Sequence, residues 1–206
     1  MKKQKIIFLL VVLLTLLSGC KSRTEFTLGE WKENQYENSW INMRFEVPTD
    51  WTIATQEEIN ELVGVGAETL NVEGTSEEQL KAMAKLKAAY PFLVSNPSNT
   101  INVQLVFENL AMTIGGTKYT VSEYMNQLSD MLLQQEAFQY ELLNQDTVEL
   151  AGKQFEMIRL SAYGGAMHQE YYAHKMGKYM ASIIISYASD AEDEKNDFIN
   201  KISAIK

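Results

Sequence analysis

The sequence predicts an α+β domain in which a central antiparallel sheet is flanked by helices. Two short strands come early, helical patterns separate the later strand pairs, and a run of four strands precedes a last helix. The expected order is therefore β-β-α-α-β-β-α-β-β-β-β-α. No internal repeat or low-complexity segment interrupts it, and the length suits one domain with a sizeable core.

The first elements are predicted to be a hairpin followed by two helices. Strands are expected at residues 31–36 and 41–47, because apolar and polar residues alternate along the second of them. Thr55 and Glu58 then have the spacing of a capping box ahead of apolar residues at helical spacing, which are Ile59, Leu62 and Val63. A second helix is expected after Gly74, with the cap Thr75-x-x-Glu78 and the inward positions Leu80, Met83, Ala84 and Leu86.

The middle of the chain predicts two strands and the clearest helix. Residues 92–95 and 101–107 read as strands of one sheet, since Ile101, Val103, Leu105 and Phe107 form an alternating apolar face in the second. Thr120-x-x-Glu123 then predicts a capped helix. The residues that trace its apolar face are Val121, Tyr124, Met125, Leu128, Leu132 and Gln135.

The last third predicts an antiparallel meander closed by a helix. Four strands are expected at residues 138–150, 154–162, 167–175 and 178–187, separated by turns that contain glycine. Ser189-x-x-Glu192 is expected to cap a final helix, from which Phe198, Ile202 and Ile205 would pack. Its acidic first turn suits the positive end of a helix dipole.

The N-terminus has the three regions of an export signal. A lysine-rich start precedes the apolar stretch 6–17, which would form a helix of about 18 Å, well short of the ~30 Å hydrocarbon core of a membrane. Ser18 and Gly19 then supply the small residues of a cleavage site. The sequence therefore predicts cleavage rather than a permanent span.

The string Leu17-Ser18-Gly19-Cys20 resembles the lipobox of bacterial lipoproteins. The resemblance implies that residues 1–19 are removed and that Cys20, the only cysteine, carries a diacylglyceryl group. Two acyl chains give stable attachment, so the chain would be anchored to the cell membrane on its extracytoplasmic face without spanning it. An ordinary secretory signal with an incidental thiol at Cys20 is the alternative. Residues 20–28 would be the lipidated terminus and tether, and 29–206 a single domain.

Charge and cysteine content exclude several classes of partner. Loss of the three lysines of the signal leaves 15 basic against 27 acidic side chains, a net charge of −12 over 187 residues. Such a chain lacks the basic surface that nucleic-acid binding requires and is repelled by anionic headgroups. With Cys20 acylated, no thiol remains for a disulfide or a metal-binding thiolate.

The domain also resembles the PsbP-like or Mog1-like group, which includes many small bacterial lipoproteins. The residues that carry this resemblance are Tyr36-x-Asn38-x-x-Ile41-x-x-x-Phe45-x-Val47-Pro48-x-x-Trp51, Leu150-Ala151-Gly152-Lys153-x-Phe155, Gln169-x-Tyr171-Tyr172 and Gly177-x-Tyr179. The resemblance covers most of residues 30–206 and implies an antiparallel sheet between helix layers, an α/β/α sandwich. It implies no common reaction and supplies no catalytic residues.

Few residues suggest chemistry. His168, Glu170, Tyr172 and His174 share one face of a predicted strand, but the two histidines would lie roughly 20 Å apart, too far to share one metal ion. A half-exposed polar strand face explains them better. We therefore predict no metal, no cofactor and no catalytic residues.

Other candidate motifs have structural explanations. Gly64-x-Gly66 lacks the third glycine of a dinucleotide loop and reads as a frayed helix end. The acidic pairs fall in first helical turns, where the dipole accounts for them; they are Glu57-Glu58, Glu77-Glu78 and Asp193-Glu194. Four tyrosines on adjacent strands are expected to be core or cross-strand contacts rather than a recognition surface; they are Tyr171, Tyr172, Tyr179 and Tyr187.

The leading interpretation is a non-catalytic binding or accessory module in the cell envelope of a single-membrane bacterium. It would bind an envelope protein or a small ligand through the sheet face or a helix–sheet crevice. An envelope hydrolase with an unrecognised active site is the alternative, which a pocket with two converging titratable groups would favour. The solute receptor of a transporter is a third hypothesis, weakened because 187 residues would have to form two lobes.

Overall fold

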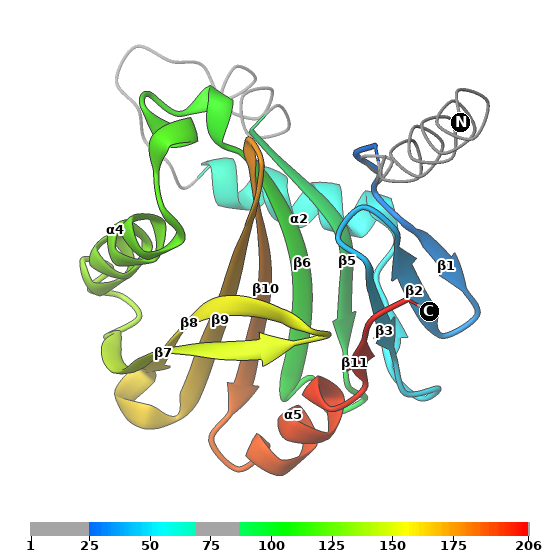
Figure 1. Ribbon diagram of the computed structural model, residues 1–206. Coiled ribbons are helices and arrows are strands. Elements are labelled where there is room, and N and C mark those ends of the chain that lie inside the picture. Colours follow the sequence, from blue (N-terminus) through cyan, green and yellow to red (C-terminus); the bar gives the residue numbers. More distant parts are fainter. Residues whose placement is uncertain (1–24, 69–86, 206) are drawn as a thin grey trace, which may run out of the picture.

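The computed structural model describes residues 25–68 and 87–205, which form an α+β fold built on two antiparallel sheets (Figure 1). The seven-stranded sheet has the order β4-β5-β6-β10-β9-β8-β7, and the four-stranded sheet has the order β1-β2-β3-β11. The large sheet consists of β4 Thr52–Ile53, β5 Ala88–Ser95, β6 Ile101–Asn109, β7 Glu141–Leu150, β8 Lys153–Ala162, β9 Met167–Met176 and β10 Tyr179–Ala188. The small sheet consists of β1 Glu30–Lys32, β2 Gln35–Asn38, β3 Met43–Glu46 and β11 Ile202–Ser203.

The predicted meander is confirmed. Strands β7 to β10 lie side by side in chain order, and β10 continues the sheet by pairing along its length with β6. The register places Arg159 opposite Glu170 and Glu170 opposite Ile185, so these residues stand in one row across three strands. The last helix covers this row, since its Lys195 contacts Glu170.

The first hairpin differs from the prediction. The segment expected to be one strand at 31–36 contains a turn instead, in which Glu33 takes a positive φ of 54°, and the chain doubles back as β1 and β2. Strand β3 follows as expected, with Met43 and Phe45 buried on one face. The result is a separate small sheet rather than an edge of the large one.

The helices are α2 Gln56–Glu68, α4 Val121–Leu133 and α5 Glu192–Ile199, and short 3-10 turns lie at Leu110–Met112 (η2), Gly116–Lys118 (η3) and Tyr163–Gly165 (η4). The capping boxes predicted at Thr55 and Thr120 are confirmed. In the first, the Glu58 amide donates to Thr55 Oγ1 at 3.3 Å and the Thr55 amide donates to Glu58 Oε2 at 2.7 Å. In α4, Thr120 and Glu123 make the same exchange. Of the predicted apolar positions in α2, Ile59 is buried but Leu62 is exposed.

The last helix is shorter than predicted. Its N-cap is Ala191 and no side chain caps it, so the expected role of Ser189 was wrong. Ile202 does not extend the helix; it lies in β11 and pairs with Phe45 of β3. Gly64 and Gly66 lie inside α2 rather than at a frayed end. The helix expected after Gly74 falls outside the described residues.

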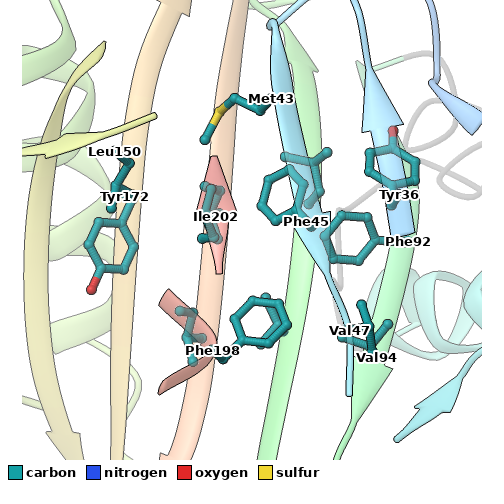
Figure 2. Packing of buried hydrophobic residues seen from close by; sticks show 14 of the residues in the cluster. Tyr36, Met43, Phe45, Val47, Phe92, Val94, Leu150, Tyr172, Phe198 and Ile202 are labelled. Atoms are coloured by element: carbon teal, nitrogen blue, oxygen red, sulfur yellow. The ribbon is translucent and has the colours of Figure 1, made fainter. Parts of the chain in front are cut away.

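The main core lies between the two sheets and α5. Figure 2 shows aromatic and aliphatic side chains of the small sheet meeting those of the large one, with Phe198 of α5 and Ile202 of β11 between them. Tyr36 and Phe45 each contact Phe92 edge-on, at ring distances of 4.8 and 5.1 Å. Burial of such side chains contributes about 1.5–3 kcal/mol each, so this layer is a major source of stability.

A second core lies on the opposite face of the large sheet, under α4 (Figure 1). Met125 of α4 is fully buried against Ile158, Leu160 and Ala173 of the sheet. The predicted helix layers are therefore present on both faces: α4 covers this face, and α5 shares the face of the main core with the small sheet. Among the described helices, none has the length and apolar composition needed to cross a bilayer.

Candidate functional site

One hollow of the described chain lies where α4, the end of β6 and the loop of η2 and η3 meet. We call it the Glu108 pocket; its volume is about 210 Å³ and it is lined by Lys87, Glu108, Leu110, Thr113, Tyr119, Tyr124, Gln127, Leu128 and Met131. The capping box of α4 positions Tyr124 and Leu128, because it fixes where the helix begins. The last residues of β6, which is held by β10, position Glu108.

The polar end of the pocket is organised around Glu108. The Tyr124 hydroxyl donates to Glu108 Oε2 at 2.7 Å, and the Lys87 ammonium lies 3.3 Å from Oε1. Burial, followed by the adjacent Glu108 carboxylate, raises the pKa of Tyr124 well above its ordinary value. The phenol is therefore a hydrogen-bond donor at neutral pH and not a base.

Thr113 provides a second polar group. It lines the pocket, and its hydroxyl is buried with no hydrogen-bond partner among the described residues. A buried hydroxyl without a partner is unfavourable, by about 1–3 kcal/mol. Leu110, Leu128 and Met131 form the apolar side. The pocket can thus hold a small molecule that has a polar group at one end and an apolar body.

A second hollow of about 310 Å³ lies between the N-terminal segment and β2. The side chain of Glu37 faces it, but Lys32 and Arg44 already bind that carboxylate. Its other lining residues are Thr27, Gly29, Glu30, Ser39 and Ile205, of which only Ile205 has a large apolar side chain. The Glu108 pocket is the better candidate on chemistry, although it is smaller.

The most unusual electrostatic feature is a buried cluster around Glu170, whose side chain is only 4% exposed. Its carboxylate accepts hydrogen bonds from Tyr172, from Tyr187 at 2.9 Å and from Lys195 of α5 at 3.0 and 3.2 Å. Arg159 Nε lies 3.3 Å away without hydrogen-bond geometry.

At the exposed edge of the cluster, the Arg159 guanidinium is balanced by the Glu192 carboxylate. Arg159 also donates to Tyr187 and to Glu192, whose pKa the arginine lowers. Burial, and then Glu170, raise the pKa of both Tyr172 and Tyr187, so that both stay protonated. The cluster thus links β8, β9 and β10 to α5 through satisfied charges, which is a structural role.

The prediction assigned these polar residues to one face of β9 correctly, but it was wrong about how far Glu170 is buried. Glu170 is buried beneath α5 rather than half exposed, and Arg159 and Lys195, its charged partners, were not expected. His174 contacts the carbonyl of Gln154 and the ring of Phe155, while His168 packs on Tyr187. Within the described ranges, no three His, Cys, Asp or Glu side chains are grouped as metal ligands.

Three of the four tyrosines are core residues, as predicted. Tyr171, Tyr172 and Tyr187 are buried, and Tyr179 stacks on Phe26 of the N-terminal segment. The acidic pairs of α2 and α5 lie in first helical turns, also as predicted. Glu77-Glu78 and Cys20 lie outside the described residues. The sequence singled out neither Glu108 nor Thr113, although Tyr124 was expected on the inward face of its helix.

Comparison with known proteins addresses the fold. The chain matches no protein-family profile, and it matches no curated protein sequence. It is similar to the solution structure of cyanobacterial PsbP (CyanoP) from Synechocystis sp. PCC 6803, with a TM-score of 0.50 and 12% identity over 88% of this chain and 99% of that one.

Weaker similarities are found to LpqN, involved in cell envelope biogenesis of Mycobacterium tuberculosis (TM-score 0.42, 10% identity, 80% of this chain and 83% of that one). A point mutant of the protein Mog1 is also similar (TM-score 0.40, 9% identity, 85% and 97%). The likeness to CyanoP concerns architecture alone. The chain has an α+β fold of the PsbP type, as its sequence predicted.

Proposed function

We propose that this chain is a lipid-anchored, non-catalytic binding module on the extracytoplasmic face of the cell membrane, and that it holds a small amphipathic ligand in the Glu108 pocket. The export signal and the lipobox at Cys20 support the location. The observation that carries the binding role is the pocket itself, which combines the Glu108 carboxylate with an apolar side formed by Leu110, Leu128 and Met131.

The chemistry of the pocket favours binding over hydrolysis. Glu108 is the one carboxylate among the lining residues, and Tyr124 and Lys87 already contact it. Two titratable groups thus converge on Glu108, the arrangement that would favour a hydrolase, but both contact the carboxylate, which is therefore not free to take a proton from water. Tyr124 donates a hydrogen bond to Glu108, and its phenol stays protonated at neutral pH. The pocket is therefore suited to recognise a hydroxyl or amide group.

The size of the pocket limits the ligand. Sites for drug-sized molecules occupy about 300–1,000 Å³, so a pocket of about 210 Å³ suits a metabolite-sized molecule or one end of a longer one. Ligand hydroxyls can donate to Glu108, while the apolar part contacts Leu128 and Met131. Nucleic acid is not expected as a partner, since the net charge of the mature chain is −12.

The pocket is tested by ligand-observed NMR with a set of small alcohols, sugars and amides. Leu128→Trp should fill the pocket and abolish the saturation transfer seen with wild type. Leu143→Trp, on the exposed β7 strand, is the matched control and should leave it unchanged. If no compound distinguishes wild type from Leu128→Trp, the pocket is not a binding site.

The anchor is tested separately by fractionation and mass spectrometry of the mature chain. Cys20→Ala should block acylation and normal cleavage but leave the circular dichroism of the domain unchanged. Replacing residues 1–20 with a secretory signal should release the domain to the medium. An unmodified Cys20 in the wild-type mature chain would contradict the proposal.

A further inference from the structure

An exposed apolar loop stands at one end of the large sheet. We call residues 110–118, which contain η2 and η3, the tip loop. Ile114 in it is 99% exposed and Met112 is 52% exposed. Single exposed apolar residues are common, but a branched aliphatic side chain held almost entirely in solvent at the end of a domain is suited to enter an apolar phase.

The tip loop is held in this shape by several bonds. The Leu110 amide donates to the Lys178 carbonyl at 2.9 Å, and the Lys175 ammonium donates to the Thr117 carbonyl at 2.9 Å. Gly116 packs so closely that a Cβ there would come within 2.6 Å of the Leu110 carbonyl oxygen. Ile114 is therefore displayed by a fixed loop, so little conformational entropy would be lost when it is buried.

The N-terminal segment runs to the same end of the molecule. Phe26 stacks on Tyr179 at 4.6 Å and contacts Trp40 edge-on at 4.9 Å. Tyr179 pairs in the sheet with Asn109, the residue directly before the tip loop. Figure 1 shows the start of the described chain and the tip loop at the upper end of the molecule, on either side of the turn between β9 and β10.

The length of chain between Cys20 and Phe26 keeps this end near the membrane. Six residue steps span at most about 20 Å when fully extended, at ~3.3–3.6 Å per residue. Because Phe26 is held by Tyr179, lipid on Cys20 would keep the β9–β10 turn within that distance of the headgroups.

The local charge also suits an anionic surface, in contrast to the acidic whole. Lys118, Lys175 and Lys178 belong to the tip loop or the strands and turn that hold it. Three acidic residues lie at this end as well. Glu25 precedes Phe26, Glu108 is paired with Lys87, and the pKa of Glu123 is lowered mainly by hydrogen bonds from Thr120. Net repulsion of the acidic body and attraction of this basic end would orient the domain with the tip loop toward the bilayer.

We propose that the tip loop docks on the lipid surface, with Ile114 and Met112 at the boundary between headgroups and acyl chains. This inference rests on the proposed anchor at Cys20 for its biological setting. It fixes the orientation of the domain, so that the Glu108 pocket, which Leu110 and Thr113 also line, lies next to the membrane.

The test uses the chain from Lys21 onward with a hexahistidine tag in place of residues 1–20, attached to vesicles of phosphatidylglycerol and phosphatidylcholine containing a nickel-chelating lipid. Without Cys20 the chain has no thiol, so Ile114→Cys introduces a single site for an environment-sensitive fluorophore. Leu143→Cys, 49% exposed on β7, is the matched control. Circular dichroism verifies that both variants are folded.

On vesicle attachment, the emission of the fluorophore at position 114 should shift to the blue and should be quenched by brominated acyl chains, whereas position 143 should show neither change. A second comparison uses untagged protein and vesicles of phosphatidylglycerol and phosphatidylcholine without nickel lipid. Untagged Ile114→Ser should bind them roughly tenfold more weakly than the untagged wild-type sequence.

The proposal is overturned if position 114 stays in a watery environment, if both positions respond equally, or if position 114 responds without vesicles as protein concentration rises, which would indicate self-association. Because the nickel lipid replaces the natural anchor, these outcomes do not depend on acylation of Cys20. Failure of the anchor would be seen in the fractionation of Cys20→Ala instead.

Discussion

Replacing Glu170 with glutamine should destabilise the domain more than replacing its lysine partner. Glu170→Gln leaves the buried Lys195 ammonium, 4% exposed as a residue, without the carboxylate that now lies 3.0 and 3.2 Å away. Removal of one member of a buried ion pair costs about 3–5 kcal/mol, because the remaining charge cannot be solvated. We expect a loss in that range.

The reverse substitution should cost less, because the surroundings of Glu170 are richer in donors. In Lys195→Met the carboxylate keeps the Tyr187 hydroxyl at 2.9 Å, the Tyr172 hydroxyl and the Arg159 guanidinium. A loss of about 1–3 kcal/mol is expected, as for a buried group that retains most of its partners. The double variant should be more stable than Glu170→Gln alone, since no unpaired ammonium is left.

Urea unfolding followed by circular dichroism measures these differences, and equal slopes for all variants would show that they share the same unfolded state. Glu192→Gln is the matched control, because this carboxylate lies at the exposed rim of the cluster and should contribute no more than about 1 kcal/mol. If Glu170→Gln costs less than Glu192→Gln, or if adding Lys195→Met does not recover stability, the cluster is not an energetically coupled unit.

Three further outcomes are expected. Thr120→Ala should lower the free energy of unfolding by about 1 kcal/mol, because the hydroxyl accepts the Glu123 amide at 3.1 Å; an unchanged urea midpoint would contradict the cap. Burial raises the pKa of Tyr36 from 10.0 to about 12, so the contribution of its neutral phenol is complete below pH 10 and is lost as pH rises through 12. Tyr36→Phe should therefore lose less stability than wild type between pH 10 and 12, and an identical loss would assign the alkaline transition to other groups. Elemental analysis of the purified domain should find no stoichiometric transition metal, since His168 and His174 are separated along one strand; one equivalent of zinc would overturn this.

The elements that were predicted well are those specified by local signals. Strand β6 has apolar residues at alternate positions from Ile101 to Phe107, and the structure buries all four of them, together with Val106. The capping box at Thr120 fixes the start of α4 within a few residues of chain. The turns of the meander contain glycine at positive φ, such as Gly152 and Gly177, so their positions could be read directly.

The small sheet could not be predicted in the same way. Its first turn uses Glu33 at positive φ, a conformation that glutamate rarely adopts, so no glycine marked it. Strand β11 is two residues long and exists because Ile202 pairs with Phe45, more than 150 positions earlier. Helical spacing of Phe198 and Ile202 favoured a longer helix, and tertiary pairing overrode that local pattern.

The Glu108 pocket could not be predicted from the sequence for a related reason. Lys87, Glu108 and Tyr124 come from three separate segments, and none belongs to a motif with fixed spacing. The inward position of Tyr124 could be predicted from the helical period, but not that its hydroxyl would meet a carboxylate at the end of β6. Sites built from single residues of distant elements become visible only once those elements are packed.

The Glu170 cluster shows how far a prediction could have been extended. Given a hairpin turning at Gly164-Gly165, simple counting places Arg159 opposite Glu170, and the structure has this register. A cross-strand pair of opposite charge could thus have been predicted.

The burial of this pair could not be inferred, because hydrophobic patterns assign charged residues to solvent by default. The cover comes from α5, where Lys195 lies in an acidic, polar stretch whose sequence suggests a solvated helix. The opposite charges of Lys195 and Glu170 neutralise each other and allow the polar surfaces of α5 and the sheet to pack. The last helix is therefore held to the sheet at a place where the sequence of each element predicts exposure.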